Sequence, residues 1–213
     1  MGSALGHEGQ YDAAIAEDRA AIMLKPDFGM AHYNLGSVLY HEGEYDAAIA
    51  EDREAIRLEP DFFMAHYNLG TTLAAKGQYD AAIAEFRDTI RLKPDFFAAH
   101  INLGNALAAT GQYDAAIAED REAVRLKPDF FMAHSNLGAS LDDKGQYDAA
   151  IAEDREAIRL KPDYAEAHNN LGFALYHKGQ YDAAIAEYRE AIRLKPGFAE
   201  AHNNLGMAIK RVR

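Results

Sequence analysis

Apolar residues recur along the chain at helical spacing, in two kinds of stretch that alternate. Within residues 97–130 they return at steps of four over 99–107, and a second apolar stripe covers 116–126. Gly111 separates the two stretches, and glycine can take the positive φ that ends a helix. The pattern therefore predicts two amphipathic helices joined by a short turn.

The same predicted helix pair returns every 34 residues. All six prolines share this spacing, and they are Pro26, Pro60, Pro94, Pro128, Pro162 and Pro196. Such a period indicates stacked repeats rather than one closed core. Alignment on the prolines predicts a single solenoid over 1–213, with a partial repeat at 1–28, a capping helix at 199–213, and full repeats at 29–62, 63–96, 97–130, 131–164 and 165–198.

Two further positions of the repeat predict how its helices begin and pack. An aspartate after the proline is expected to cap the next first helix, and the candidates are Asp27, Asp61, Asp95, Asp129 and Asp163. A glycine inside a helix costs about 1 kcal/mol relative to alanine, so its presence in every first helix indicates a close approach to the second helix. These glycines are Gly36, Gly70, Gly104, Gly138, Gly172 and Gly206.

The motifs L-G-x-x-L, G-x-Y, A-A-I, A-I and L-K-P at this period resemble the tetratricopeptide repeat, and the resemblance covers essentially the whole chain. It implies an all-α fold, a right-handed superhelical solenoid of antiparallel helix pairs whose first helices line a concave groove. It also implies protein binding without naming the partner, because a fold does not fix a function.

Two positions depart from that family's pattern. A histidine replaces the large residue early in the first helix, at His32, His66, His100, His134, His168 and His202. An aspartate replaces the aromatic residue in the second helix at Asp18, Asp52, Asp120 and Asp154, whereas Phe86 and Tyr188 keep a ring. Two alternatives are open: each carboxylate bonds the histidine of the next repeat, as Asp52 with His66, or the aspartates face solvent.

Composition excludes several classes of function. The chain has no cysteine, hence no disulfide and no thiolate chemistry, and a net charge of −12 disfavours nucleic acid as a partner. No apolar run reaches the length that spans a membrane, and no secretion signal is visible at the start. We therefore expect a cytoplasmic protein, and any charged partner is expected to be basic.

Catalytic chemistry is not indicated. The repeated histidines stand on successive helix pairs, which lie too far apart to share one metal ion. Catalysis normally needs one asymmetric cluster of groups, and this sequence offers no constellation that occurs only once. The sequence predicts no enzyme activity, no cofactor and no metal site.

The face of the first helices that points away from the apolar seam varies most between repeats, and by the family resemblance it lines the groove. Its candidate peptide-binding residues are Met30, Tyr33, Ser37, Tyr40, His41, Met64, Tyr67, Thr71, Ile101, Asn105, Met132, Asp142, Asp143, Glu166, Asn169, Phe173 and Tyr176. Exposed tyrosine and methionine favour recognition because they give large contact areas, and the alternative is that they fill gaps between helices. Lysine or arginine of a ligand is expected near Asp142, Asp143 and Glu166.

A constant row of asparagines accompanies this face, at Asn34, Asn68, Asn102, Asn136, Asn170 and Asn204. It resembles the asparagine row in the superhelix of O-linked N-acetylglucosamine transferase, where such amides hold a peptide backbone. An amide suits that role because it donates and accepts hydrogen bonds. The alternative is that the amides tie neighbouring helices together.

The sequence thus predicts an interaction module that binds a peptide segment of a partner protein in its groove. The rival is a self-assembling scaffold without a dedicated ligand. Residues 1–8 are expected to form only a short first helix, which leaves the second helix at 11–25 partly uncovered, while 199–213 forms a first helix with no second helix behind it. These two regions are complementary, so they are expected either to dock head to tail or, for 199–213, to act as a solubilising cap.

Overall fold

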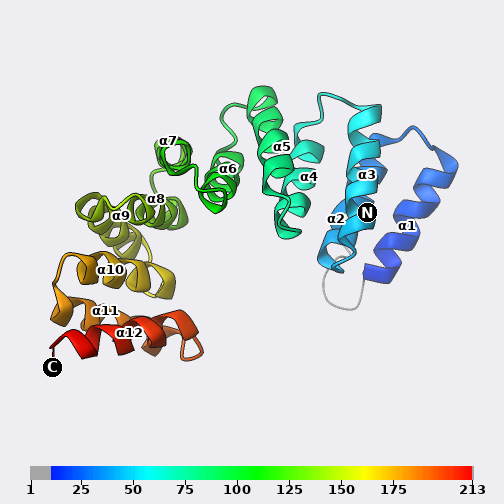
Figure 1. Ribbon diagram of the computed structural model, residues 1–213. Coiled ribbons are helices and arrows are strands. Elements are labelled where there is room, and N and C mark those ends of the chain that lie inside the picture. Colours follow the sequence, from blue (N-terminus) through cyan, green and yellow to red (C-terminus); the bar gives the residue numbers. More distant parts are fainter. Residues whose placement is uncertain (1–10, 213) are drawn as a thin grey trace. The chain divides into compact units, whose positions relative to one another are not determined.

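The computed structural model describes residues 11–212, and over this range all elements of regular secondary structure are α-helices joined by short turns. The described helices are α1 (Tyr11–Leu24), α2 (Gly29–His41), α3 (Tyr45–Leu58), α4 (Phe63–Ala75), α5 (Tyr79–Leu92), α6 (Phe97–Ala109), α7 (Tyr113–Leu126), α8 (Phe131–Asp143), α9 (Tyr147–Leu160), α10 (Ala165–His177), α11 (Tyr181–Leu194) and α12 (Ala199–Val212) (Figure 1). Even-numbered helices are the first helices of the repeats, here called first-type, and odd-numbered helices are second-type. The predicted all-α fold class is confirmed. None of these helices has the length and apolar character needed to cross a membrane.

The turn after each first-type helix depends on one glycine in the left-handed region. Gly43 has a φ of 80°, and its amide donates to the Tyr40 carbonyl while the Glu44 amide donates to the Leu39 carbonyl. These bonds satisfy the last carbonyls of α2. The same conformation recurs at Gly77, Gly111, Gly145 and Gly179. The predicted role of these glycines is confirmed, and Gly9 lies outside the described residues.

Each second-type helix ends two residues before a proline. After α3, Glu59 takes φ −132° and ψ 83°, away from the helical region that a following Pro60 disfavours.

The predicted aspartate caps are wrong wherever a first-type helix start is described in detail. The residue at the N-cap is aromatic there and no side chain caps the helix, as at Phe28, Phe62, Phe130 and Tyr164. The aspartate stands one position too early.

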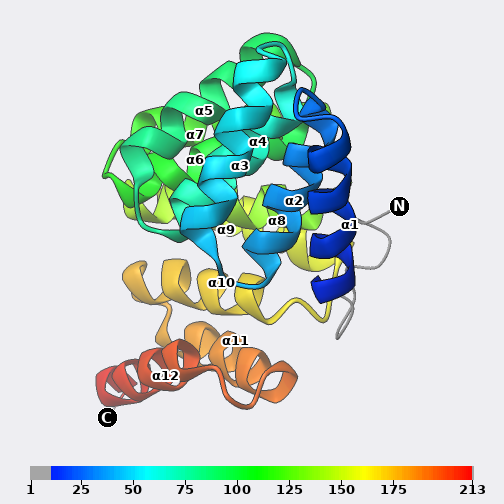
Figure 2. The ribbon, with the colours of Figure 1, turned by 90° about the vertical axis from the view of Figure 1, so that its right-hand side faces the viewer.

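The helices group into two compact parts, Met1–Ala106 and Leu107–Arg213, with the boundary inside α6. In the N-terminal part, α2 packs on α3, α4 packs on α5, and α2 also lies beside both α1 and α4 (Figure 2). In the C-terminal part, α8 packs on α9, α10 packs on α11, and α10 contacts α8 and α12. One continuous solenoid over 1–213, with the repeat boundaries given above, stays a prediction.

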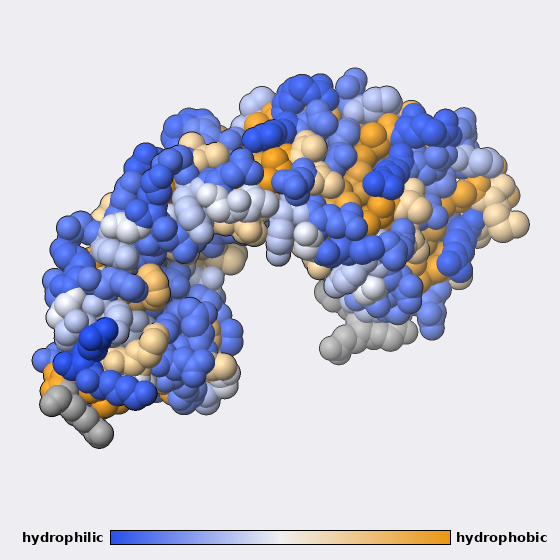
Figure 3. Space-filling view, in the orientation of Figure 1, coloured by the Kyte–Doolittle hydropathy of each residue, from blue (hydrophilic) through white to orange (hydrophobic). Residues whose placement is uncertain are grey.

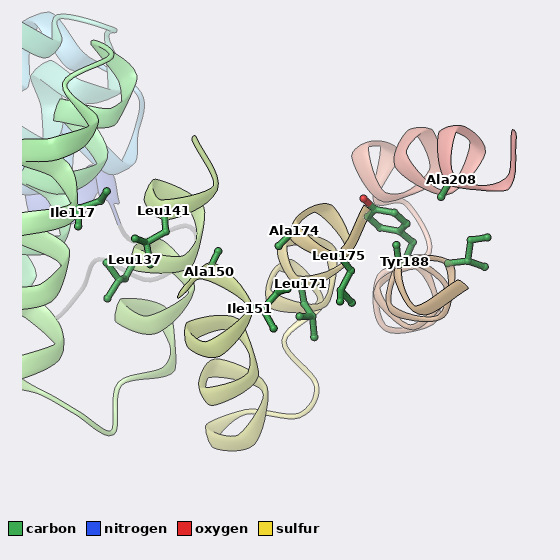
Figure 4. Packing of buried hydrophobic residues seen from close by; sticks show 12 residues of the cluster. Ile117, Leu137, Leu141, Ala150, Ile151, Leu171, Ala174, Leu175, Tyr188 and Ala208 are labelled. Atoms are coloured by element: carbon green, nitrogen blue, oxygen red, sulfur yellow. The ribbon is translucent and has the colours of Figure 1, made fainter. Parts of the chain in front are cut away.

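Leucine and isoleucine from both helix types form the core of each part. In the C-terminal part, Leu137 and Leu141 of α8 and Leu171 and Leu175 of α10 lie in one cluster that also contains Tyr188 (Figure 4). In the N-terminal part the corresponding cluster is Leu35, Leu39 and Ala48, with Ile15 and Ile22 of α1 packed against it. The predicted apolar seams therefore hold the helices together, and they leave the other face of the first-type helices for function.

Candidate functional site

In α2, α4, α8 and α10, a histidine near the start of the helix bonds a glutamate of the second-type helix behind it. His66 Nδ1 lies 2.7 Å from Glu85 Oε2, and His66 Nε2 lies 3.2 Å from the carbonyl oxygen of Pro60. The glutamate distance is the same in the pairs His32 with Glu51, His134 with Glu153, and His168 with Glu187. These bonds fix the first-type helix against both the preceding turn and its partner helix.

Both partners of this histidine are acceptors, so the ring donates from both nitrogens when it is protonated. The hydrogen bond to Glu85 raises the pKa of His66 above its ordinary value, although burial opposes the shift. At His168, burial lowers the pKa, but the hydrogen bonds to Glu187 and to the Pro162 carbonyl together outweigh this effect. The net result is a pKa above the ordinary histidine value. The glutamate is a residue that sequence reasoning missed, although its constant spacing of 19 residues from each histidine is a signal for it.

The predicted contact between Asp52 and His66 is wrong, because His66 bonds Glu85 instead. The alternative, that the aspartates face solvent, is also wrong. Asp52 and Asp154 are completely buried, and neither oxygen of either carboxyl has a hydrogen-bond partner within the described residues. Asp18 and Asp120 are buried as well, and each leaves one oxygen without a partner there.

Asp52 and Asp154 lie against the glycine inside the first-type helix. A Cβ at Gly36 would stand 2.6 Å from Asp52 Oδ1, and a Cβ at Gly70 would stand 2.7 Å from Cε1 of the Phe86 ring. The predicted close approach is confirmed at Gly36, Gly70, Gly138 and Gly172, whereas a Cβ at Gly206 would meet nothing within 4 Å. The side chain that approaches is a carboxyl in some repeats and a ring in others. We call each contact a glycine notch. Among the described contacts, the notches are Gly36 with Asp52, Gly70 with Phe86, Gly138 with Asp154, and Gly172 with Tyr188.

Burial raises the pKa of these carboxyls because the charged form loses its hydration. The pKa of Asp52 rises to about 8, with the charge of Glu51 adding to the effect of burial. Burial raises the pKa of Asp120 only to about 7, since Ser140 Oγ donates to Asp120 Oδ2 at 2.6 Å. Burial and then the charge of Asp142 raise the pKa of Asp154 well above its ordinary value. These groups are thus uncharged over part of the range near neutral pH.

Six of the predicted groove residues line one cavity in the N-terminal part. The cavity has a volume of about 100 Å³, lies between α2 and α4, and is lined by Gly36, Ser37, Tyr40, His41, Tyr67, Asn68, Thr71 and Thr72. The Tyr67 hydroxyl accepts a hydrogen bond from Asn102 Nδ2 at 3.0 Å, and its ring meets Phe96 edge-on at 5.0 Å between centroids. One wall of the cavity is therefore held in place by neighbours outside it.

The other predicted residues of the N-terminal part lie apart from this cavity. Met30 and Asn34 line a second cavity of about 530 Å³ beside α1. The Tyr33 ring packs on Phe62 with 4.9 Å between centroids. Met64 is half-buried, Ile101 is buried and Asn105 is exposed.

In the C-terminal part the predicted residues differ widely in exposure. Met132 and Asp143 are exposed, Asp142 and Asn169 are buried, and Asn136, Phe173 and Tyr176 are half-buried. Phe173 packs against the His177 ring at 4.4 Å between centroids, and the Tyr176 hydroxyl accepts a hydrogen bond from Arg211 Nε at 3.2 Å. Glu166 Oε1 accepts a hydrogen bond from Lys195 Nζ at 2.7 Å.

Three asparagines of the row, Asn102, Asn170 and Asn204, use their amide donors within the protein. Asn102 donates to the Tyr67 hydroxyl, and Asn204 Nδ2 donates to Asn169 Oδ1 at 3.1 Å, in each case 35 residues earlier on the preceding first-type helix. Asn170 Nδ2 lies 3.3 Å from Ser135 Oγ in the same register. These amides tie neighbouring first-type helices together, as the second alternative predicts. Recognition of a peptide backbone by the row stays a prediction.

Three side chains with metal-binding groups come together between α4 and α5. His66, Glu85 and Asp88 place one ligand atom each within 4.8 Å of one another. Glu85 is bonded to His66, and Asp88 Oδ1 accepts a hydrogen bond from Arg91 Nε at 3.1 Å. The repeated histidine–glutamate pair therefore supplies two of the three groups.

Comparison with known proteins gives the following. Two protein-family models match, one described as tetratricopeptide repeat over residues 67–129 and one described as TPR repeat over 36–75, 143–179 and 174–211. YrrB, described as a TPR protein with an unusual peptide-binding site, is similar at 22% identity and a TM-score of 0.72, over 87% of this chain and 96% of that one. The APC/C hetero-tetramer Cut9-Hcn1 is similar at 22% identity and a TM-score of 0.79, over 94% of this chain and 40% of that one. MamA from Desulfovibrio magneticus RS-1 is similar at 24% identity and a TM-score of 0.73, over 80% of this chain and 97% of that one. No curated protein matches at a significant level. At these identities the likeness to solved structures shows the fold.

Proposed function

Because the chain belongs to the tetratricopeptide repeat family, whose members are protein-interaction modules, we propose that its first-type helices bind a peptide segment of a partner protein. The family fold is generally a non-catalytic interaction scaffold. The observation that carries the peptide proposal is the meeting of six predicted groove residues in one cavity between α2 and α4. The peptide-binding site in the description of YrrB, a protein of the same fold, adds support.

The chemistry of this cavity suits one side chain of an extended peptide. Aromatic rings of Tyr40 and Tyr67 stand beside the polar groups of Ser37, Asn68 and Thr71. Binding sites typically combine apolar walls with a few fixed polar groups in this way. The ligand places an apolar or aromatic side chain in the cavity, while its backbone meets the polar groups at the rim.

Of the three acidic residues expected to contact basic groups of a ligand, one has a carboxylate that is open to a ligand. Asp142 is buried and Glu166 already pairs with Lys195, so neither offers an open acidic group. Asp143 is exposed. We propose that a lysine or arginine of the ligand, where present, lies near Asp143.

Filling the cavity is the sharpest test of the proposed function. Ser37→Phe introduces the residue that the same repeat position carries at Phe173, so the helix pair tolerates it. A peptide selected on the intact chain by display should bind this variant at least about tenfold more weakly, which corresponds to about 1.4 kcal/mol. Isothermal titration calorimetry measures the affinity, and thermal unfolding checks that the variant stays folded.

Two further substitutions separate the groove from the rest of the surface. Tyr67→Ala should weaken binding of the selected peptide by about 1 kcal/mol or more, as truncation of an anchor residue commonly does. Arg53→Ala changes an exposed residue of the second-type helix α3 and should leave binding unchanged. Loss of affinity in Arg53→Ala, with both groove variants neutral, would overturn the proposal.

A further inference from the structure

A third metal-binding group stands beside one of the histidine–glutamate pairs. Glu85 and Asp88 lie three residues apart on α5, a spacing that places both side chains on the same face of a helix. His66 of α4 is bonded to Glu85 across the two helices. One ligand atom from each of the three residues lies within 4.8 Å of the other two, and no other such group is found within the described residues.

The histidine ring presents a suitable nitrogen to this cluster. Nε2 of His66 lies 3.2 Å from the carbonyl oxygen of Pro60, which can only accept, so Nε2 carries a proton. In the neutral ring Nδ1 then has a free lone pair, and Nδ1 is the atom that faces Glu85 at 2.7 Å. Histidines that bind metals are commonly oriented in this way, by donating the other ring N–H to a carbonyl. A cation in place of the shared proton would satisfy both side chains.

The length of the third side chain distinguishes this helix pair from the others. The corresponding residue is glutamate in α3, α7, α9 and α11, and there both carboxylate oxygens bond an arginine three residues later. Glu156, for example, accepts from Arg159 at 2.7 and 2.6 Å. The shorter Asp88 gives Arg91 only Oδ1, at 3.1 and 3.0 Å. The second oxygen of Asp88 is therefore free of that ion pair.

Small movements would bring the three groups to coordination distance. Ligands of a tetrahedral zinc ion lie about 2 Å from the metal and so about 3.3 Å from one another. The side chains of Glu85 and Asp88 are 24% and 44% exposed, so both can shift toward that arrangement and a hydrated ion can reach them. Hydrophilic residues also cover much of the face of the N-terminal part that Figure 3 shows. One imidazole with two carboxylates suits zinc better than calcium or magnesium, which prefer oxygen ligands alone.

We infer that His66, Glu85 and Asp88 bind one zinc ion, or a chemically similar divalent metal ion, between α4 and α5. The sequence predicts no metal site because successive repeats are too far apart to share an ion, whereas all three ligands here come from one helix pair. Three protein ligands leave a coordination position for water or for a group of a partner. None of the three residues lines the cavity between α2 and α4, so metal binding is independent of the proposed peptide binding.

Calorimetric titration of zinc chloride into the intact, metal-free chain tests the inference. One ion should bind per chain, ahead of any weaker binding to the histidine–glutamate pairs that lack a third group. Asp88→Asn should weaken this event at least about tenfold. Asp80→Asn removes the same charge from an exposed position of the same helix, so it is the matched control and should bind zinc like the original chain. Thermal unfolding without zinc checks that both variants fold.

A reciprocal exchange tests whether the length of the third side chain decides. Asp88→Glu reproduces the side chain of the other helix pairs and should also weaken zinc binding at least about tenfold. Glu156→Asp gives the α8/α9 pair, which holds His134 and Glu153, the same three groups as α4/α5. This variant should therefore bind a second zinc ion per chain.

Long-range proton–nitrogen NMR of the histidine rings identifies the ligand atom. Zinc should shift the Nδ1 signal of His66, assigned by its loss in His66→Gln, while Nε2 keeps the signal of a protonated nitrogen. Four results would each overturn the inference. They are no binding at up to about 0.1 mM zinc, binding that Asp88→Asn leaves unchanged, coordination through other histidines, or reciprocal variants that bind like the original chain.

Discussion

The helix pairs α2/α3 and α4/α5 place their notch glycines in equivalent positions but fill the notches with different chemistry. Gly36 faces the carboxyl of Asp52, whereas Gly70 faces the ring of Phe86. Both side chains are completely buried. The C-terminal part repeats the contrast, with Asp154 at the notch of Gly138 and Tyr188 at the notch of Gly172. The contrast is therefore a property of the repeat position and not of one place in the chain.

The difference shows that the fold accepts an uncharged carboxyl where it otherwise holds a ring. A buried carboxylate without a partner would be strongly unfavourable, and protonation removes most of that cost. The ring contributes apolar burial at every pH, whereas the carboxyl is tolerated only while it holds its proton. Helix pairs with aspartate should therefore be less stable than pairs with a ring, and increasingly so as pH rises.

Exchanging the ring for a carboxyl should have the largest effect. Phe86→Asp removes a completely buried ring and adds a carboxyl without a donor, so we expect a loss of about 3–5 kcal/mol in the free energy of unfolding at neutral pH. Urea unfolding followed by circular dichroism measures the loss. Ala84→Asp, at an exposed position of α5, is the control and should cost under about 1 kcal/mol. Equal losses in the two variants would mean that the notch has no special role.

The pH dependence of stability should have the next largest effect. An unfolded aspartate has a pKa near 3.8 and folded Asp52 a pKa of about 8, so between these values the folded state binds the additional proton. Stability should therefore fall as pH rises across that window, and the fall is complete above the folded pKa. We expect a decrease of about 2 kcal/mol or more between pH 5 and pH 9, since each unit of pKa difference is worth about 1.4 kcal/mol.

Asparagine variants show whether the buried carboxyls cause this dependence. Asp52→Asn, Asp120→Asn and Asp154→Asn combined should flatten the curve of melting temperature against pH. Asp80→Asn, at an exposed position of α5, should leave the curve as it is. A steep curve that persists in the triple variant would assign the dependence to other groups.

A hydroxyl donor should reduce the difference between the two kinds of notch. Ser140 of α8 bonds Asp120, and the repeat carries Ala174 at the position of Ser140 relative to Asp154. Ala174→Ser should stabilise the chain by about 1 kcal/mol, because the new hydroxyl offers the buried Asp154 carboxyl a hydrogen-bond donor. Ser140→Ala should do the reverse through Asp120. If neither variant changes stability at pH 9, hydrogen bonding does not set the cost of the carboxyl.

The histidine–glutamate pair should contribute least. Glu85→Gln removes the carboxylate that raises the pKa of His66, and the pair is partly exposed, so we expect a loss of about 0.5–1 kcal/mol at pH 6. A histidine with a raised folded pKa stabilises the protein below its unfolded pKa and loses that contribution as pH rises through the folded value. The variant should therefore match the original chain at pH 9. A loss that is the same at both pH values would point to packing instead of charge.

Much of the fold could be predicted because proline and glycine act locally. Pro60 restricts Glu59 and so ends α3, and Gly43 provides the φ that ends α2, without reference to distant residues. The helix-capping prediction placed the N-cap one residue too early. The aromatic Phe62 takes the N-cap position in front of α4, and Asp61 stands just outside it.

The side-chain partners could not be predicted, because they depend on how two helices face each other. Neighbouring residues Glu51 and Asp52 point in different directions, and only the packing of α2 on α3 decides which of them meets His32. Burial of Asp52 is equally invisible in a sequence, where a charged residue suggests solvent. The cavity between α2 and α4 is lined by residues about 30 positions apart in the sequence. The sequence therefore identified candidate residues but could not predict that they line one cavity.

The ionisation of Asp52 tests the central claim most directly. Carbon-13 NMR of the aspartate carboxyls, with Asp52 assigned by the loss of its signal in Asp52→Asn, follows this group through a pH titration of the folded chain. We predict a midpoint at about 8, the pKa that burial without a partner gives Asp52. A midpoint near the ordinary aspartate value of 3.8 would contradict the account, because a charged carboxyl would then be stable in the glycine notch.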